Sequence, residues 1–227
     1  MRRVAAAGLA VAALAGCGST HTGGSATLWI TRDRGQHVLL ISKVKAGQTA
    51  MAALQQVTTV KTSYGGRFAQ SIDGVSGSRS GQHDWFYFVN GYEADRGAAD
   101  YKLHPGDVEW WDYRSWKDEM HVPAVVGAFP EPFLHGYDGK TRDATVVFDS
   151  KALGPQARAL GKLIHAKTLT ADHLGDANVL FLTRADVPLS ATTKGAGEPV
   201  RFVIGPTAAR RLLADPKLVR FRYSGLR

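Results

Sequence analysis

The stretch QHDWFYFVNGYEADRGAADYKLHPGDVEWWDYRSW, residues 82–116, decides how this chain of 227 residues folds. It holds four of the five tryptophans and four of the seven tyrosines. The run from Asp84 to Val89 is aromatic or β-branched at nearly every position, which favours a strand that is covered on both faces. We expect this strand to lie in the middle of its sheet, with the other segments arranged around it.

Two turns follow this strand. Asn90-Gly91 accepts positive φ at both corner positions of a type I′ hairpin, so the chain is expected to reverse there. The segment His104-Pro-Gly-Asp107 predicts a second turn, and Val108–Trp116 a further strand. Because side chains alternate along a strand, Trp110 and Trp111 must point to opposite faces. We expect one of them to enter the core and the other to be exposed.

Shorter elements precede this stretch. Thr49 is a suitable N-cap for a helix over Ala50–Val57, which is rich in good helix formers. The other strands expected here are Thr27–Thr31 and Gln36–Ser42, which form a hairpin, and Phe68–Ile72. The order β-β-α-β-β-β predicts an α+β domain over residues 26–118, with a mixed sheet around one helix, which is the β-grasp arrangement.

Three motifs in this domain resemble a known family. They are Trp-x-Tyr-x-Val-Asn-Gly (Trp85 to Gly91), Gly-Ala-Ala-Asp-Tyr (Gly97 to Tyr101), and Gly-Asp followed by Trp-x-Tyr (Gly106, Asp107, Trp111, Tyr113). The pattern resembles the C-terminal β-domain of transcobalamin and intrinsic factor, and the transcobalamin-like domain of many bacterial lipoproteins. The resemblance implies a β-grasp fold and a corrinoid such as cobalamin as the ligand. In transcobalamin a helical barrel closes the site, and these 227 residues contain no such barrel.

The remainder of the chain predicts a connector and a second domain. Residues 119–143 hold three prolines among apolar residues, as ordered irregular connectors do. Beyond them, the expected elements are strand Ala144–Phe148, helix Pro155–His165, strands Asn178–Thr183 and Val200–Ile204, helix Pro206–Leu213 and strand Leu218–Tyr223. We interpret residues 144–227 as a small ferredoxin-like βαββαβ domain.

The N-terminus has the pattern of a lipoprotein signal peptide. A basic Met1-Arg2-Arg3 and an apolar stretch from Val4 to Ala13 lead into Leu14-Ala-Gly-Cys17. That tetrapeptide resembles the lipobox at which bacterial lipoproteins are cut and lipidated on cysteine, with a plain secretory signal as the alternative. We expect residues 1–25 to be a signal peptide and tether, with lipidated Cys17 holding the protein on the extracytoplasmic face of the cell membrane.

The formal net charge of +8 is concentrated near the C-terminus. Residues 144–227 carry 13 basic and six acidic side chains. A basic domain at a membrane is attracted to anionic lipid head groups. The expected compartment and the lack of a nucleic-acid-binding module argue against a nucleic-acid partner.

The sequence contains no strong catalytic motif, such as Gly-x-Ser-x-Gly, His-Glu-x-x-His or a P-loop. We therefore expect no enzymatic activity, and no metal site from the scattered histidines. Aromatic side chains are the better candidates, because they offer wide rigid surfaces to ligands and partners. The candidate ligand-binding residues are Trp85, Tyr87, Tyr92, Trp110, Trp111, Asp112, Arg114 and Trp116, although about two-thirds of the rings are needed for the core alone.

Three functions fit these features. The first is a membrane-anchored lipoprotein that captures a corrinoid or similar large ligand for uptake. The second is an accessory subunit that docks onto a membrane transporter complex through its aromatic patch and basic domain. The third is a module that binds cell-wall glycan. No cofactor other than the possible corrinoid ligand is indicated.

Overall fold

The computed structural model describes residues 23–167 and 175–226. It is an α+β molecule built mostly of strands, which confirms the predicted class. The largest sheet has five strands, in the spatial order β2 (His37–Lys45), β1 (Ser25–Arg32), β8 (Val108–Ser115), β6 (His83–Val89) and β7 (Tyr92–Glu93). Strands β1 and β8 are parallel, whereas the other neighbours are antiparallel. Cys17 and its lipidation, predicted above, lie outside the described residues.

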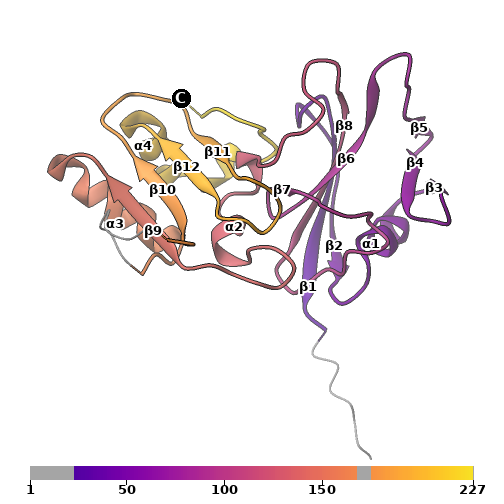
Figure 1. Ribbon diagram of the computed structural model, residues 1–227, viewed down its shortest axis with the longest axis horizontal. Helices are drawn as coiled ribbons and strands as arrows, with labels where there is room; N and C mark the ends of the chain where they lie inside the picture. Colours follow the sequence, from indigo (N-terminus) through magenta and orange to yellow (C-terminus); the bar gives the residue numbers. More distant parts are fainter. Residues whose placement is uncertain (1–22, 168–174, 227) are drawn as a thin grey trace, which may run out of the picture.

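One helix and a second, small sheet accompany this five-stranded sheet (Figure 1). The helix α1 (Ala50–Val57) begins where it was predicted, and the Thr49 hydroxyl accepts a hydrogen bond from the Ala52 N–H at 3.1 Å. This bond satisfies one of the free amides of the first turn. The small sheet consists of β3 (Val60–Ser63), β4 (Phe68–Ile72) and β5 (Val75–Ser76). Only β4 of these three strands was predicted.

The turn after β6 forms as the sequence predicted. Asn90 and Gly91 have φ values of 50° and 87°, and Val89 pairs with Tyr92 across the turn. The Asn90 side chain donates to Asp107 and to the Gly136 carbonyl, and it accepts from the Val108 N–H at 2.7 Å. A Cβ at position 91 would lie 2.9 Å from the Val125 carbonyl. The turn is thus also the place where the connector packs closely on the sheet.

The connector and the second part of the chain contain the remaining elements. The connector includes η1 (Val126–Ala128) and α2 (Glu131–Leu134). After it come β9 (Ala144–Phe148), η2 (Lys151–Leu153), α3 (Gly154–Leu163), β10 (Asn178–Leu182), β11 (Ser190–Thr192), β12 (Arg201–Ile204), α4 (Pro206–Ala214) and η3 (Pro216–Val219). Their strands form a four-stranded sheet in the order β11-β12-β10-β9.

The ferredoxin-like prediction for this part is wrong. Strands β9, β10 and β12 are mutually parallel, and only β11 is antiparallel, whereas a ferredoxin-like sheet alternates. The predicted last strand, Leu218–Tyr223, is not a strand. Pro216 begins a 3₁₀ turn there, and the chain then leaves the four-stranded sheet. Its Phe221 and Tyr223 pack onto Trp29 and Trp110 of the first sheet instead.

Both faces of the five-stranded sheet are therefore covered. One face contributes Leu28, Ile30 and Trp111 to the main core, together with α1. The opposite face forms a smaller apolar cluster made of Trp29, Phe88, Val108, Trp110, Val122, Val125, Ala128 and Tyr223. The connector supplies Val122, Val125 and Ala128, and the C-terminal segment supplies Tyr223. This covering decides where the aromatic side chains can act.

Candidate functional site

Trp110 and Trp111 point to opposite faces, as predicted, but neither is exposed. Their exposed fractions are 0% and 3%. The expectation that one of them would be exposed is wrong, because the connector and the C-terminal segment cover the face of Trp110, and Trp111 packs in the main core. The two rings nevertheless have different surroundings, since only Trp111 lines a cavity.

Trp110 belongs to a buried hydrogen-bond network centred on Asp112. The Trp110 indole donates to the Thr31 hydroxyl at 2.7 Å, and Thr31 donates to Asp112. Asp112 also accepts from the N–H groups of Arg34 and Gly35 and from the Tyr223 hydroxyl at 2.9 Å. Burial raises the pKa of Asp112, and these donors oppose that shift. This carboxylate joins the C-terminal segment to the sheet.

Arg114 and Tyr92 are likewise buried among protein groups. The Arg114 guanidinium donates to the carbonyls of Glu119 and Met120 and lies 3.7 Å from the centre of the Phe86 ring. Tyr92 contacts Tyr137 of the connector edge to face, and burial raises its pKa to about 12. Four of the eight predicted site residues, Tyr92, Trp110, Asp112 and Arg114, therefore do not line the cavity.

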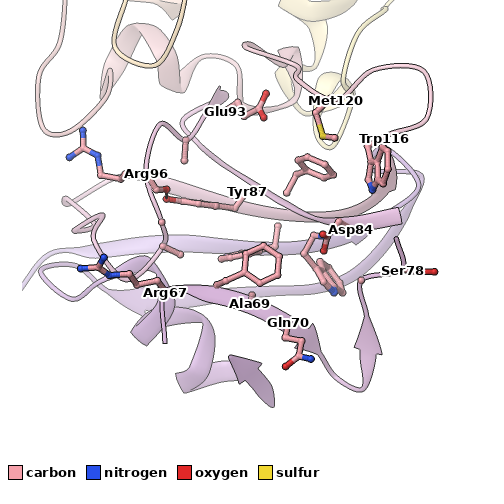
Figure 2. A pocket seen from close by; sticks show the side chains of 18 of the residues that line it. Arg67, Ala69, Gln70, Ser78, Asp84, Tyr87, Glu93, Arg96, Trp116 and Met120 are labelled. Carbon is pink, nitrogen blue, oxygen red and sulfur yellow. Dashed lines mark hydrogen bonds between the residues drawn. The ribbon is translucent and has the colours of Figure 1, made fainter. Parts of the chain in front are cut away.

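The other four, Trp85, Tyr87, Trp111 and Trp116, line one groove of about 610 Å³ (Figure 2). One wall is β6 and the other is the edge of the small sheet. The remaining lining residues are Arg67, Phe68, Ala69, Gln70, Gly77, Ser78, Arg79, Asp84, Phe86, Glu93, Ala94, Arg96, Gly97, Ala98 and Met120. Figure 2 shows Arg67 and Arg96 at one end, Tyr87 in the middle and Trp116 at the other end.

The floor of the groove is a rigid aromatic pair. Tyr87 and Trp111 are stacked, with ring centres 4.9 Å apart and an interplanar angle of 20°. The Tyr87 hydroxyl donates to the Arg96 carbonyl, and the Trp111 indole donates to Glu109 at 2.6 Å. Burial raises the pKa of the Tyr87 hydroxyl. Because the Tyr87 hydroxyl and the Trp111 indole N–H are already hydrogen-bonded, the floor presents ring surface to the groove and no free donor.

Glu109 lies beneath this floor and was missed by the sequence analysis. It is completely buried, and burial raises its pKa well above the usual range, against the opposing hydrogen bond from Trp111. Its second oxygen, Oε2, forms no hydrogen bond with any described residue. A neutral carboxylic acid fits this environment better than a carboxylate. An acidic residue within an otherwise apolar run of a strand, as in Val-Glu-Trp-Trp (108–111), was the available signal.

The small sheet forms the wall opposite β6, and two hydrogen bonds hold it against the five-stranded sheet. The Trp85 indole donates to the Val75 carbonyl at 2.8 Å, and the Tyr113 hydroxyl donates to the Ser76 carbonyl at 3.1 Å. These bonds hold β5 next to β6 and β8. They also explain why Trp85, although it lines the groove, is only 6% exposed.

The charged groups at the rim are largely paired. Arg96 binds Asp95 at 2.8 Å and Asp138 at 3.3 Å, and Arg67 lies 3.7 Å from Asp100. Glu93 accepts the Val122 N–H at 2.6 Å. Burial raises the pKa of Asp84, although the Trp85 N–H, which it accepts at 2.8 Å, lowers it. The groove as a whole is apolar with a nearly balanced rim.

Within the residues that the structure describes, no cluster of three metal-ligating side chains occurs, and no helix is both long and apolar enough to cross a membrane.

Comparisons with known proteins bear on this region. Residues 47–115, which include α1, β3 to β8, Tyr87 and Trp111, match the family DUF4430, described as a domain of unknown function. No curated protein sequence matches the chain. A protein from Ruminococcus gnavus ATCC 29149, described as a candidate metal-binding protein, is similar in structure, with 13% identity and a TM-score of 0.34; the alignment covers 40% of this chain and 97% of that one.

Haptocorrin in complex with Cbi is similar at 13% identity and a TM-score of 0.33, and the alignment covers 40% of this chain and 25% of haptocorrin. At this level of similarity, the groove has to be interpreted from its own geometry.

Proposed function

We propose that this protein is a binding lipoprotein, held at the extracytoplasmic face of the cell membrane by Cys17, whose ligand occupies the aromatic groove. Two separate observations support it. The sequence up to Cys17 has the signal and lipobox pattern, and the groove joins four of the aromatic residues predicted for a site. The protein would hold its ligand without converting it.

The stacked pair Tyr87 and Trp111 is the observation that carries this proposal. A pair of rings whose polar atoms are already bonded favours contact with a flat apolar surface. Cavities of 300–1,000 Å³ with mostly apolar walls are typical of small-molecule sites, and this one holds about 610 Å³. The half-buried Trp116 and the exposed Met120 add further apolar surface to the groove.

A corrinoid such as cobalamin is the ligand that the sequence resemblance implies. Its large flat ring system is the kind of surface that the aromatic floor favours. The groove is too small to enclose so large a molecule, so it would hold one edge and leave the rest to solvent or to a partner. Capture for uptake therefore requires handing the ligand to a second protein.

Isothermal titration of the full-length protein in detergent with cobalamin and with cobinamide tests the ligand. We expect saturable binding, weakened at least tenfold by Trp116→Ala, because a ring in contact with the ligand is lost. Leu39→Ala is the matched control, since Leu39 is 51% exposed on the distant edge strand β2. If neither corrinoid gives a heat signal at high micromolar concentration, a corrinoid is excluded as the ligand. If Trp116→Ala leaves the binding unaffected, the groove is excluded as the binding site.

The anchor is tested separately. Labelled palmitate should enter the wild-type protein and be absent from the Cys17→Ala variant. Equal labelling of both proteins contradicts a lipid anchor at this residue.

An accessory subunit of a membrane transporter complex is the second candidate, and one observation favours it. The edge strand β2 exposes Val38, Leu39 and Ile41, at 45%, 51% and 55%. Exposed apolar side chains on a sheet edge are typical of interaction surfaces. Pull-down from membranes with wild type, Ile41→Lys and Trp116→Ala separates the candidates, because a partner lost only with Ile41→Lys indicates docking through β2.

A further inference from the structure

One wall of the groove is an interrupted strand edge. Along one side β6 pairs with β8 from His83 to Val89. Along its other side it pairs with β7 only at Phe88 and Val89, and with Ser78 through an isolated bridge at His83. Between these two points β6 has no neighbouring strand in the described chain, and the groove lies there.

The alternation of the antiparallel ladder shows which backbone groups face this gap. His83 exchanges hydrogen bonds with Ser78 at 3.1 and 2.8 Å, and the Tyr87 carbonyl accepts from the Ala94 N–H at 3.2 Å. Odd-numbered residues of β6 therefore direct their backbone groups away from β8, and Trp85 must do so as well. The Trp85 N–H is already bonded to the Asp84 carboxyl group.

This leaves one acceptor and one donor, the Trp85 carbonyl and the Tyr87 N–H. No described residue forms a hydrogen bond with either group. In a parallel pair of strands, one residue donates its N–H to the carbonyl before its partner and accepts from the N–H after its partner. A residue opposite Phe86 would complete both bonds at once. An antiparallel guest would need the Trp85 N–H, which Asp84 occupies.

We propose that an extended peptide segment binds in the groove by adding a parallel strand to β6, with its central residue opposite Phe86. The proposal rests on the proposed function in that the groove is the ligand site, and it identifies the occupant as a peptide. Main-chain hydrogen bonds supply affinity in such strand addition, and pockets for alternate side chains supply selectivity.

The walls specify the side chains of that peptide. Side chains of a guest strand point alternately to two flanks. One flank offers Tyr87 and Trp111, and the other offers Phe86 and Met120, which also line the groove. Both flanks are apolar, so apolar residues are expected at successive positions of the guest.

The paired charges at the end of the groove that holds Arg67 and Arg96 argue against an acidic segment there. The guanidinium groups of Arg67 and Arg96 are paired with Asp100, Asp95 and Asp138. That end of the groove therefore has no unbalanced positive charge to attract an acidic peptide. The proposed guest is a neutral, apolar, extended stretch of about three to five residues, since only Asp84 to Tyr87 of β6 are open.

The test uses full-length protein labelled with [¹⁵N]tyrosine and a library of acetylated, amidated hexapeptides of Val, Phe and Thr in all orders. The label gives seven backbone amide signals, and Tyr87→Phe identifies that of Tyr87. When the best-binding hexapeptide is added, the NMR signal of the Tyr87 amide proton should shift downfield, and this proton should exchange more slowly with solvent. Methylating the peptide nitrogen that bonds the Trp85 carbonyl should weaken binding about tenfold, and methylation of the neighbouring nitrogens should have little effect.

Three outcomes overturn strand addition. They are no binding by any hexapeptide at millimolar concentration, equal affinity for all N-methylated analogues, and binding with an unchanged Tyr87 amide. Cobinamide that binds and leaves the Tyr87 amide unchanged, while no hexapeptide binds, refutes the peptide and leaves the proposed function intact. Peptide binding that Ile41→Lys abolishes places the peptide on β2 and also refutes the proposal.

Discussion

The two faces of the five-stranded sheet carry similar aromatic residues, but one face is enclosed and the other borders the groove. On one face Trp110 is enclosed by the connector and the C-terminal segment, and its indole is part of a hydrogen-bond network around Asp112. On the other face Trp111 is stacked on Tyr87 and borders the groove. Adjacent residues of one strand thus take part in a core and in a candidate site.

The difference teaches that the covering segments, and not the rings, decide which role an aromatic residue has. The segment that covers Trp110 comes from more than a hundred positions later in the chain, since Tyr223 bonds Asp112 across 111 residues. A Cβ on Gly35 would lie 1.7 Å from the Phe221 carbonyl, so this covering is tightly packed. The groove persists beside Trp111 because β6 has no neighbouring strand between His83 and Phe88 among the described residues.

The largest expected effect comes from removing the enclosed ring. Trp110→Ala should lower the free energy of unfolding by about 3–5 kcal/mol, because a large buried side chain and its hydrogen bond to Thr31 are lost. Urea unfolding followed by circular dichroism measures this. A decrease of less than about 1 kcal/mol would contradict the assignment of Trp110 to the core.

Loosening the C-terminal cover should have a smaller effect. Tyr223→Phe removes a donor to the buried carboxylate of Asp112 and should cost about 1–3 kcal/mol of unfolding free energy. The matched control is Tyr64→Phe, because Tyr64 is 84% exposed and should lose almost nothing. Equal losses in the two variants would show that the bond to Asp112 does not secure the C-terminal segment.

Glu109 beneath the groove should give a distinct pH dependence. Its pKa is raised in the folded state, so above about pH 4.3 the unfolded chain loses a proton that the folded chain keeps. The free energy of unfolding therefore falls as pH rises, by up to about 1.4 kcal/mol per pH unit, until the folded-state pKa is reached. Glu109→Gln lacks this contribution, so its stability relative to wild type should increase between pH 5 and pH 8.

Urea unfolding of both proteins at several pH values measures the difference. The carboxyl groups of Asp84 and Asp112 are shifted in the same direction and are present in both proteins, so they cancel in the comparison. Parallel stability profiles for wild type and Glu109→Gln would mean that Glu109 is not held neutral.

The smallest effect on stability is expected at the rim of the groove. Trp116→Ala should change the free energy of unfolding by less than about 1 kcal/mol, because Trp116 is only partly buried. The same substitution should strongly weaken ligand binding. Thermal unfolding measures the change in stability. A loss as large as that of Trp110→Ala would contradict the claim that the two faces differ.

Local signals predicted several features of the first sheet but not its strand order, since the Asp84–Val89 strand was expected in the middle and β8 lies there instead. Thr49 begins its helix, Asn90-Gly91 forms its turn, and the alternation placed Trp110 and Trp111 on opposite faces, because each depends on neighbours within a few residues. The covering segments depend on distant contacts, so the burial of Trp110 and the fate of Leu218–Tyr223 were not predictable. The parallel pairing of β9, β10 and β12 was missed since strand direction is not encoded in periodicity.

The same limits apply to the candidate site. Trp85, Tyr87, Trp111 and Trp116 were predicted from their aromatic character and do line the groove. Asp112 and Arg114 were predicted as ligand-binding residues, but they share a face with Trp110, and this face is closed. The contribution of Phe68 to Gln70 was not foreseen, because it arises from the packing of one sheet against another.

The most direct measurement of the central claim is ¹⁹F NMR of the protein labelled with 5-fluorotryptophan, which gives five signals that single Trp→Phe variants assign. On addition of a saturating ligand, whether cobinamide or the best hexapeptide, the account predicts that the signals of Trp85, Trp111 and Trp116 shift and those of Trp29 and Trp110 do not. Shifts confined to Trp29 and Trp110 on binding, or no shift of any signal, would contradict it.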